Sequence, residues 1–210
     1  MADITVAKGS GRAPSPMRLR LLEAAELCLL RDGYAGLSTR AVAEAAQTQL
    51  SQIHYHFGSK QGLVLALLAH QNEKLLVRQT DLIGADAPVS ARWARACDVL
   101  EEDLRSGYVR VLQEIIAAGY SDPEMAAAAR DLLEGWSVLL TQLGADAGAV
   151  LALGGSLTAE EIGALIGMMF LGAESMILID INSPIRSALR GVGHAIAKLE
   201  AAAEERSHAR

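Results

Sequence analysis

Apolar residues recur every three to four positions along most of this chain, which is the period of an α-helix. Runs of alternating β-branched residues, the mark of a half-buried strand, are absent. Polar or glycine-containing breaks divide the helical pattern into separate segments. We therefore expect an all-α protein. The expected helices cover residues 16–32, 38–46, 49–57, 59–83, 90–106, 108–118, 122–144, 158–181 and 183–203.

Capping residues mark several of the helix starts. Ser15 and Asp122 each precede a proline, and proline suits the first helical position because its missing N–H needs no partner there. Thr158 and Glu161 have the spacing of a capping box, in which each side chain accepts a hydrogen bond from the other residue's backbone N–H. Ser90 is the expected N-cap of the helix that follows it.

Glycines mark two of the expected helix ends. Gly33 follows an aspartate and can take the left-handed conformation that closes the first helix. Gly144 is expected to end the helix that starts near Asp122. The glycine- and alanine-rich residues 145–157 are then expected to form a loop.

The segments 38–46 and 49–57 are short helices separated by a polar turn, which is a helix-turn-helix arrangement. The second of them carries an unusual polar and aromatic set. Glutamine can pair with adenine edges in the major groove of DNA, whereas tyrosine, histidine and lysine suit phosphates. A solvated polar helix beside a loop is the alternative interpretation. The set consists of Gln49, Gln52, His54, Tyr55, His56 and Lys60.

This stretch resembles the DNA-binding domain of the TetR family of bacterial transcriptional regulators. The family's second helix opens with a threonine, here Thr39. Its recognition helix ends Tyr-x-His-Phe-x-x-Lys, which stands here as residues 54–60 with His54 in place of the tyrosine. The likeness reaches back to about Met17 and covers the first quarter to third of the chain.

The turn departs from the family's usual Gly-Val-Ser, because this chain has Gln47, Thr48 and Gln49 there. Gln47 must then take the place of a residue that is free to adopt a positive φ. The family alignment puts the helix N-cap at Gln49, whereas local propensity favours Thr48. Ser51 replaces a second glycine that is usual inside the recognition helix.

The resemblance implies three regions: an arm at residues 1–15, a helix-turn-helix DNA-binding domain at 16–63, and a C-terminal ligand-binding and dimerisation domain at 64–210. It also implies a homodimer that reads a palindromic operator in double-stranded DNA. Gln49 and Gln52 are the expected base contacts, with Leu50 against a thymine methyl. The other expected DNA contacts are Thr39, Arg40, His54, Tyr55, His56 and Lys60.

The charge distribution agrees with a nucleic-acid-binding N-terminus, although the net charge of the whole chain is −6. Residues 1–60 hold seven Lys and Arg against five Asp and Glu, a net of +2. Residues 61–210 hold twelve against twenty, a net of −8. The positive end is the end that carries the helix-turn-helix, and this supports the DNA-binding interpretation.

The two C-terminal segments predict a dimer. The helix expected over 158–181 is apolar on nearly all sides; its length would suit a membrane, but Glu174 inside it argues against a span. Burial on two sides, by its own domain and by a partner chain, is the preferred explanation. The last helix carries one narrow apolar stripe, and two helices from each chain can close a bundle. The expected interface residues are Leu165, Met169, Ile185, Leu189, Val192, Ile196 and Leu199.

The resemblance further implies a small-molecule cavity among residues 90–181, whose ligand releases a repressor from its operator. Large side chains there can line a pocket, although each of them suits an ordinary core equally well. Glu114 and Glu174 could orient a polar or cationic ligand. The candidate pocket residues are Trp93, Tyr108, Glu114, Trp136, Met168, Met169 and Glu174, with Phe170 beside them.

Two alternatives come from other functional classes: a DNA-binding dimer that needs no ligand, and a small helical enzyme using the same cavity. No Ser-His-Asp, paired-carboxylate or metal-spaced motif supports the enzyme, so we expect none, with no cofactor and no metal. Cys28 and Cys97 lie in apolar helical patterns and are expected to be buried free thiols. The N-terminus lacks the apolar run of a signal peptide, so a cytoplasmic protein without membrane contact is expected.

Overall fold

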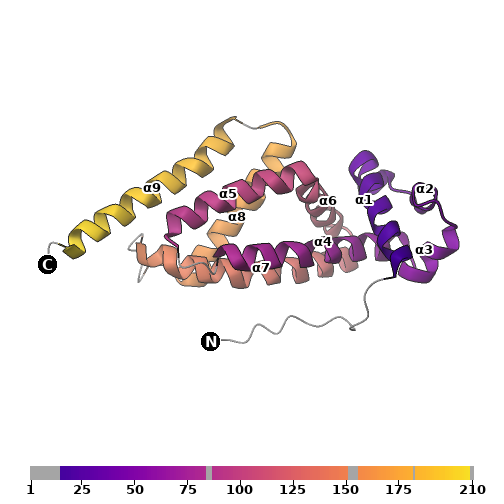
Figure 1. The fold of residues 1–210 in the computed structure, drawn as a ribbon, viewed down its shortest axis with the longest axis horizontal. Coiled ribbons are helices and arrows are strands. Elements are labelled where there is room, and N and C mark those ends of the chain that lie inside the picture. The colour runs from indigo at the N-terminus through magenta and orange to yellow at the C-terminus, as the bar shows by residue number, and fades with distance from the viewer. Residues whose placement is uncertain (1–14, 84–86, 151–155, 182, 209–210) are drawn as a thin grey trace. The chain divides into compact units, whose positions relative to one another are not determined.

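The computed structural model describes residues 15–83, 87–150, 156–181 and 183–208. Within these ranges the backbone forms nine helices and no strand, which confirms the predicted all-α class (Figure 1). The arm expected at residues 1–15 lies, apart from Ser15, outside the described residues. The helices are α1 (Pro16–Gly36), α2 (Thr39–Ala45), α3 (Leu50–Phe57), α4 (Lys60–Ile83), α5 (Val89–Ser106), α6 (Tyr108–Gly119), α7 (Pro123–Val150), α8 (Ala159–Leu178) and α9 (Ser183–His208).

The chain divides into two compact units, Met1–Leu67 and Leu68–Arg210, with α4 beginning in the first and continuing into the second. The expected boundary lay a few residues earlier, after Leu63. The first unit has its own apolar core, to which all of its helices contribute. Its fully buried side chains are Leu21, Leu22, Leu29, Val42, Ile53, Leu63, Val64 and Leu67.

The capping predictions hold at several helix starts. The hydroxyl of Ser15 accepts a hydrogen bond from the Arg18 N–H at 3.2 Å. The Asp122 carboxylate caps α7, and Thr158 and Glu161 form the expected capping box on α8. Ser90 was wrong as an N-cap, because α5 begins earlier, after Pro88. Its hydroxyl instead donates a hydrogen bond to the Glu200 carboxylate of α9.

Two helix ends differ from the sequence-based expectation. Gly33 does take a positive φ of 69°, but the chain then adds one more helical turn, so that α1 ends at Gly36. The helix α7 does not end at Gly144 and runs on to Val150, so the loop predicted from 145 onward is wrong as far as residue 150. The rest of that predicted loop lies outside the described residues up to 155.

Close contact between α7 and α8 explains the glycines that suggested a loop. A Cβ atom at Gly144 would lie 2.3 Å from the Ala159 carbonyl oxygen of α8. A Cβ atom at Gly163 of α8 would lie 2.7 Å from the carbonyl carbon and oxygen of Leu140 on α7. Glycine is therefore used here for backbone approach between two helices, and its tendency to break a helix is overridden by that packing.

We expect Gly163→Ala to lower the free energy of unfolding of the C-terminal unit by about 1–3 kcal/mol, because the added methyl group meets backbone atoms that cannot give way. Gly191→Ala is the matched control. A Cβ atom at Gly191 meets nothing within 4 Å, so this change should be neutral or stabilising by up to about 1 kcal/mol. Urea unfolding of both variants tests the prediction, and equal stabilities would contradict it.

Among the described helices, α8 is long and apolar enough to cross a bilayer by length and composition, with a mean hydropathy of 1.6. In the structure one side of α8 instead packs into the core of the C-terminal unit. Ile162, Ile166, Ala173 and Ile177 are buried there. The opposite side remains exposed, as expected for a helix with a second packing surface.

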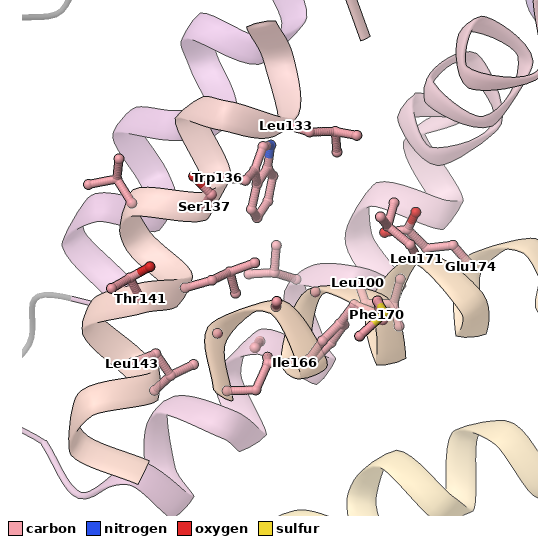
Figure 2. Close-up of a pocket in the computed structure, with 18 of the residues that line it drawn as sticks. Leu100, Leu133, Trp136, Ser137, Thr141, Leu143, Ile166, Phe170, Leu171 and Glu174 are labelled. Carbon is pink, nitrogen blue, oxygen red and sulfur yellow. The ribbon is translucent and has the colours of Figure 1, made fainter. Parts of the chain in front are cut away.

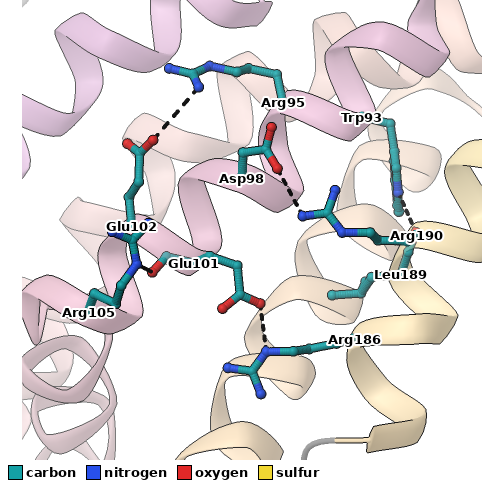
Figure 3. Close-up of polar contacts among 9 residues, drawn as sticks. All are labelled: Trp93, Arg95, Asp98, Glu101, Glu102, Arg105, Arg186, Leu189 and Arg190. Atoms are coloured by element: carbon teal, nitrogen blue, oxygen red, sulfur yellow. Dashed lines mark hydrogen bonds and ion pairs between the residues drawn. The ribbon is translucent and has the colours of Figure 1, made fainter.

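Within the C-terminal unit, side chains of α5 bind α9 (Figure 3). The Trp93 indole N–H donates a hydrogen bond to the Leu189 carbonyl oxygen at 2.7 Å. Arg186 and Arg190 of α9 pair with Glu101 and Asp98 at 2.6 Å and 2.9 Å. These contacts fix which face of α9 turns inward.

The apolar stripe of α9, expected at a dimer interface, lies mainly in the subunit's own core. Leu189 and Ile196 are only 5% and 4% exposed, and Ile185 and Val192 pack against the same cluster. The predicted partner contacts of Leu189 and Ile196 are therefore corrected, because these side chains are used within the subunit, whereas Ile185 and Val192 are only partly buried and their partner contacts stay a prediction. Leu199 is exposed, as are Leu165 and Met169 of α8.

Candidate nucleic-acid interface and helical-domain cavity

The helix-turn-helix consists of α2, a tight turn and α3. The Ser38 hydroxyl caps α2 by accepting a hydrogen bond from the Ala41 N–H. In the turn, Gln47 has a φ of 51°, the left-handed conformation expected from its position. Gln49 is the N-cap of α3 but makes no side-chain capping hydrogen bond. The alignment with the family therefore located the cap correctly, and local propensity for Thr48 did not.

The short helix α3 has one buried and one open face. Ile53 is fully buried beneath it, whereas the Tyr55 side chain is 81% exposed. None of the nine side chains expected to contact DNA is buried in the first unit. Arg40, Gln49, His54 and Tyr55 are exposed, and Thr39, Leu50, Gln52, His56 and Lys60 are partly exposed.

Several contacts fix the end of α3 and the residues beside it. The His54 Nδ1–H donates a hydrogen bond to the Gly58 carbonyl oxygen at 3.0 Å, so His54 closes the helix as well as facing solvent. The Lys60 ammonium lies 4.7 Å from the centre of the Tyr34 ring. Such a cation–π contact restricts the motion of the lysine side chain and holds its ammonium group in position for an anion such as a phosphate.

The helix α1 braces this region through two arginines whose roles the sequence did not indicate. The Arg20 guanidinium donates to the Ala46 carbonyl oxygen at 2.5 Å, at the end of α2. The Arg18 guanidinium lies 5.3 Å from the centre of the Phe57 ring, at the end of α3. Both contacts link residues far apart in sequence, so no local pattern could have predicted them.

A cavity of about 720 Å³ lies among α5, α6, α7 and α8 in the C-terminal unit (Figure 2). Its walls are largely aliphatic and aromatic, and a volume of this size suits a small organic molecule. The Trp136 ring projects from α7 into this space. The apolar lining includes Leu100, Val109, Leu112, Leu133, Leu140, Leu143, Ile166, Phe170 and Leu171.

The cavity wall contains only part of the set expected from the sequence. Tyr108, Trp136, Met168 and Glu174 line it, together with Phe170. Trp93, Glu114 and Met169 do not. Trp93 is buried in the core against Phe170, with ring centres 5.4 Å apart, and Met169 is exposed on α8. These corrections have one cause: a large side chain in a helix can turn to the core, the cavity or the surface, and packing decides which.

Three charged lining residues were not expected: Glu160 at the start of α8, which is exposed, and the pair Arg92 and Asp103. Both members of the pair lie on α5 and are almost fully buried. Arg92 pairs with Asp146 of α7 at 2.8 Å. A usable signal was present in the sequence, because residues 92, 96, 99 and 103 follow one another at helical spacing and so share one face of α5.

Burial dominates the electrostatics of the cavity. It raises the pKa of Glu174 to about 7, with a smaller contribution in the same direction from Asp103. A hydrogen bond of 2.9 Å from the Gln113 amide opposes that rise. Burial also raises the pKa of Tyr108, and Asp103 and Glu174 add to this effect, while the nearby Trp136 indole lowers it slightly.

The structure also bears on metal binding and on the two cysteines. In the part of the chain that the structure describes, no group of three or more His, Cys, Asp or Glu residues could hold a metal ion. Cys28 and Cys97 are buried and unbridged, as predicted, and burial raises the pKa of both thiols. A raised thiol pKa disfavours the reactive thiolate.

Comparison with known proteins agrees with the geometry of the first unit. The family described as "Bacterial regulatory proteins, tetR family" matches residues 21–67. The HTH-type transcriptional repressor AcnR of Corynebacterium glutamicum is 38% identical over 58 residues, which are 28% of this chain and 31% of AcnR. The chain thus aligns with about a third of the length of this curated relative.

The whole described fold is similar to solved regulators of low sequence identity. A putative transcriptional regulator from Saccharomonospora viridis, solved in complex with choline, superimposes with a TM-score of 0.72 at 19% identity, over 88% of this chain and 97% of that one. The regulator FadR of Bacillus subtilis, solved in complex with stearoyl-CoA, gives 0.68 at 14% identity, over 85% and 96%. Residues 21–67 therefore match the DNA-binding domain of the TetR family of bacterial regulatory proteins, and the chain as a whole shares the fold of these solved regulators.

Proposed function

We propose that this protein is a cytoplasmic, homodimeric transcriptional repressor that binds a palindromic DNA operator and is released by a small molecule. The observation that carries the DNA-binding part is the open face of α3. Tyr55 and the neighbouring polar side chains lie on a short helix, and the fully buried Ile53 anchors this helix in the core of the first unit. A rigid helix with an exposed polar face is what reading a major groove requires.

The exposed side of α8 supports a dimer. Four large apolar side chains, Leu165, Met169, Met176 and Ile179, are each at least 41% exposed at helical spacing. We propose that α8 and α9 of a second copy of this chain cover this surface. Two-fold symmetry would then bury the same four side chains on each chain. Dimerisation also explains how such a short recognition helix gains selectivity, since two of them would read half-sites about 34–36 Å apart or multiples of that.

The cavity supports control by a ligand over the ligand-independent alternative. It is lined by α5, α6, α7 and α8 of the same unit, and its volume of about 720 Å³ has room for a small organic molecule. Choline and stearoyl-CoA are bound by the two solved relatives, which are similar to this chain in fold. A ligand here would act by preferring one of two conformations, and could change DNA affinity only by its difference in affinity for them.

Selection of bound DNA from a random pool, with the purified full chain at near-physiological salt, tests the proposal. We expect enrichment of one palindromic sequence, which then becomes the probe for ligand screening. Salt-sensitive binding without any enriched sequence would contradict sequence-specific recognition, because contacts to phosphates alone carry no sequence information.

A further inference from the structure

We propose that the cavity selects an organic cation, with its ammonium group beside Glu174 and Asp103 and its apolar body along the aliphatic wall. This inference rests on the proposed role of the cavity as the ligand site, and it specifies the chemical class of the ligand. It follows from three features of the lining: the balance of charges, the aromatic rings and the hydrogen bonds left open.

The charge balance of the described lining is negative. Asp103 comes from α5 and Glu174 from α8, and the two carboxyl groups interact electrostatically. Arg92 is the cationic residue of this lining, and its guanidinium already pairs with Asp146 at 2.8 Å. A carboxylate ligand would therefore meet the buried Asp103 and the partly buried Glu174, whereas an ammonium group would reduce the repulsion between them.

Aromatic side chains belong to the same lining, and Tyr108 lies near both acids. Tyr108 from α6, Trp136 from α7 and Phe170 from α8 all belong to the lining. A cation over the face of such a ring is attracted by the electron density of the ring, more strongly when water is excluded. Carboxylates together with aromatic rings form the combination that binds quaternary ammonium groups, which cannot donate hydrogen bonds.

Two buried polar atoms also remain available to a ligand. The Tyr108 hydroxyl and the Trp136 indole nitrogen are buried, and the indole lies close enough to the hydroxyl to lower its pKa without forming a regular hydrogen bond. A ligand oxygen or a bound water would give these two donors a well-formed partner. The cavity therefore offers a place for a ligand acceptor as well as for a cation.

Cation binding should depend on pH through Glu174. The groups that face Glu174 are Asp103 of α5, Tyr108 and Gln113 of α6 and Trp136 of α7. Because burial raises the pKa of Glu174 to about 7, its carboxyl group changes from mostly neutral to mostly ionised between about pH 6 and about pH 8. A bound cation favours the ionised form, so cation affinity should rise up to about tenfold over this range.

Isothermal titration of the full chain with octyltrimethylammonium, octanol and octanoate, near pH 8, tests the inference. The three probes share one alkyl chain and differ in the charge of the head group. We expect the cation to bind at least about tenfold more tightly than the other two, since burial of a charge discriminates strongly. Equal affinities, tighter binding of octanoate, or no binding of any probe would overturn the inference.

Matched variants locate the effect. Glu174→Gln keeps the shape and an acceptor for Gln113, and should weaken octyltrimethylammonium binding about five- to tenfold while leaving octanol unchanged. Asp103→Asn should act in the same direction and serves as the second variant if the first folds poorly. Glu134→Gln removes the same charge from an exposed position on α7 and should change nothing.

The same probes separate the inference from the proposed function. If the cation binds selectively but changes operator affinity less than about twofold, the ligand class stands and control of DNA binding by this cavity fails. If the protein binds a palindrome but the three probes bind equally, the regulator stands and the cation inference fails.

Discussion

Replacing Gln52 and Tyr55 together by alanine is expected to weaken binding to the selected operator at least about 100-fold. A side chain that contacts a base edge contributes about 1–3 kcal/mol of discrimination, and each variant dimer loses a proposed base contact and a phosphate contact in both half-sites. Both side chains lie on the open part of α3, Tyr55 being 81% exposed, so the fold of the first unit should survive. Fluorescence anisotropy with labelled operator DNA measures the loss.

Glu23→Ala is the control for this experiment, because Glu23 is exposed on α1 of the same unit and is not among the proposed DNA contacts. Its operator affinity should stay within about twofold of the unchanged protein. A double variant that binds the operator as tightly as the control would exclude α3 as the recognition helix. If the double variant lost its preference for the operator but kept a salt-dependent affinity for DNA, α3 would contribute base contacts alone.

Stability of the C-terminal unit is expected to fall as pH rises from about 5 to about 8, and Glu174→Gln should remove most of this dependence. The pKa of Glu174 is raised from 4.5 to about 7 in the folded protein, mainly by burial. Between these two values the folded state holds a proton that the unfolded state has lost, so a higher pH favours unfolding. The full effect is at most about 3.5 kcal/mol, at about 1.4 kcal/mol for each pKa unit.

Urea unfolding at several pH values between about 5 and about 8 measures this dependence. The variant should match the unchanged protein near pH 5 and be more stable than it near pH 8. Glu134→Gln, an exposed change of the same charge, should keep the original dependence. A Glu174→Gln variant with an unaltered pH profile would contradict the assignment of this pH dependence to Glu174.

The local signals in the sequence were reliable where a helix start depends on neighbouring residues. Ser15, Asp122 and Thr158 cap their helices as expected, because a capping side chain bonds backbone groups only two or three positions away. Recognition of the helix-turn-helix was equally local. Its buried Ile53, exposed Tyr55 and positive φ at Gln47 all lie within one short stretch of chain.

Tertiary structure decided the features that depend on contacts between distant segments. Gly144 suggested a helix end, but the backbone of α8 packs against it and the helix continues. The apolar stripe of α9 suggested a partner chain, yet Leu189 and Ile196 are buried against α5 and its neighbours. A glycine has the same local preference at a helix end and at a close helix contact, and an apolar side chain has the same preference at a dimer interface and in the core. Only the neighbouring segment distinguishes the two cases.

The cavity shows the same division most clearly. The sequence by itself determined that residues 90–181 form helices with large apolar side chains and a few acids among them. It did not determine that Tyr108, Trp136 and Glu174 share a cavity with Arg92 and Asp103, while Trp93 turns away to hold α9. Helical periodicity fixes the face of each helix on which a residue lies, but the crossing of α5, α6, α7 and α8 fixes which faces meet.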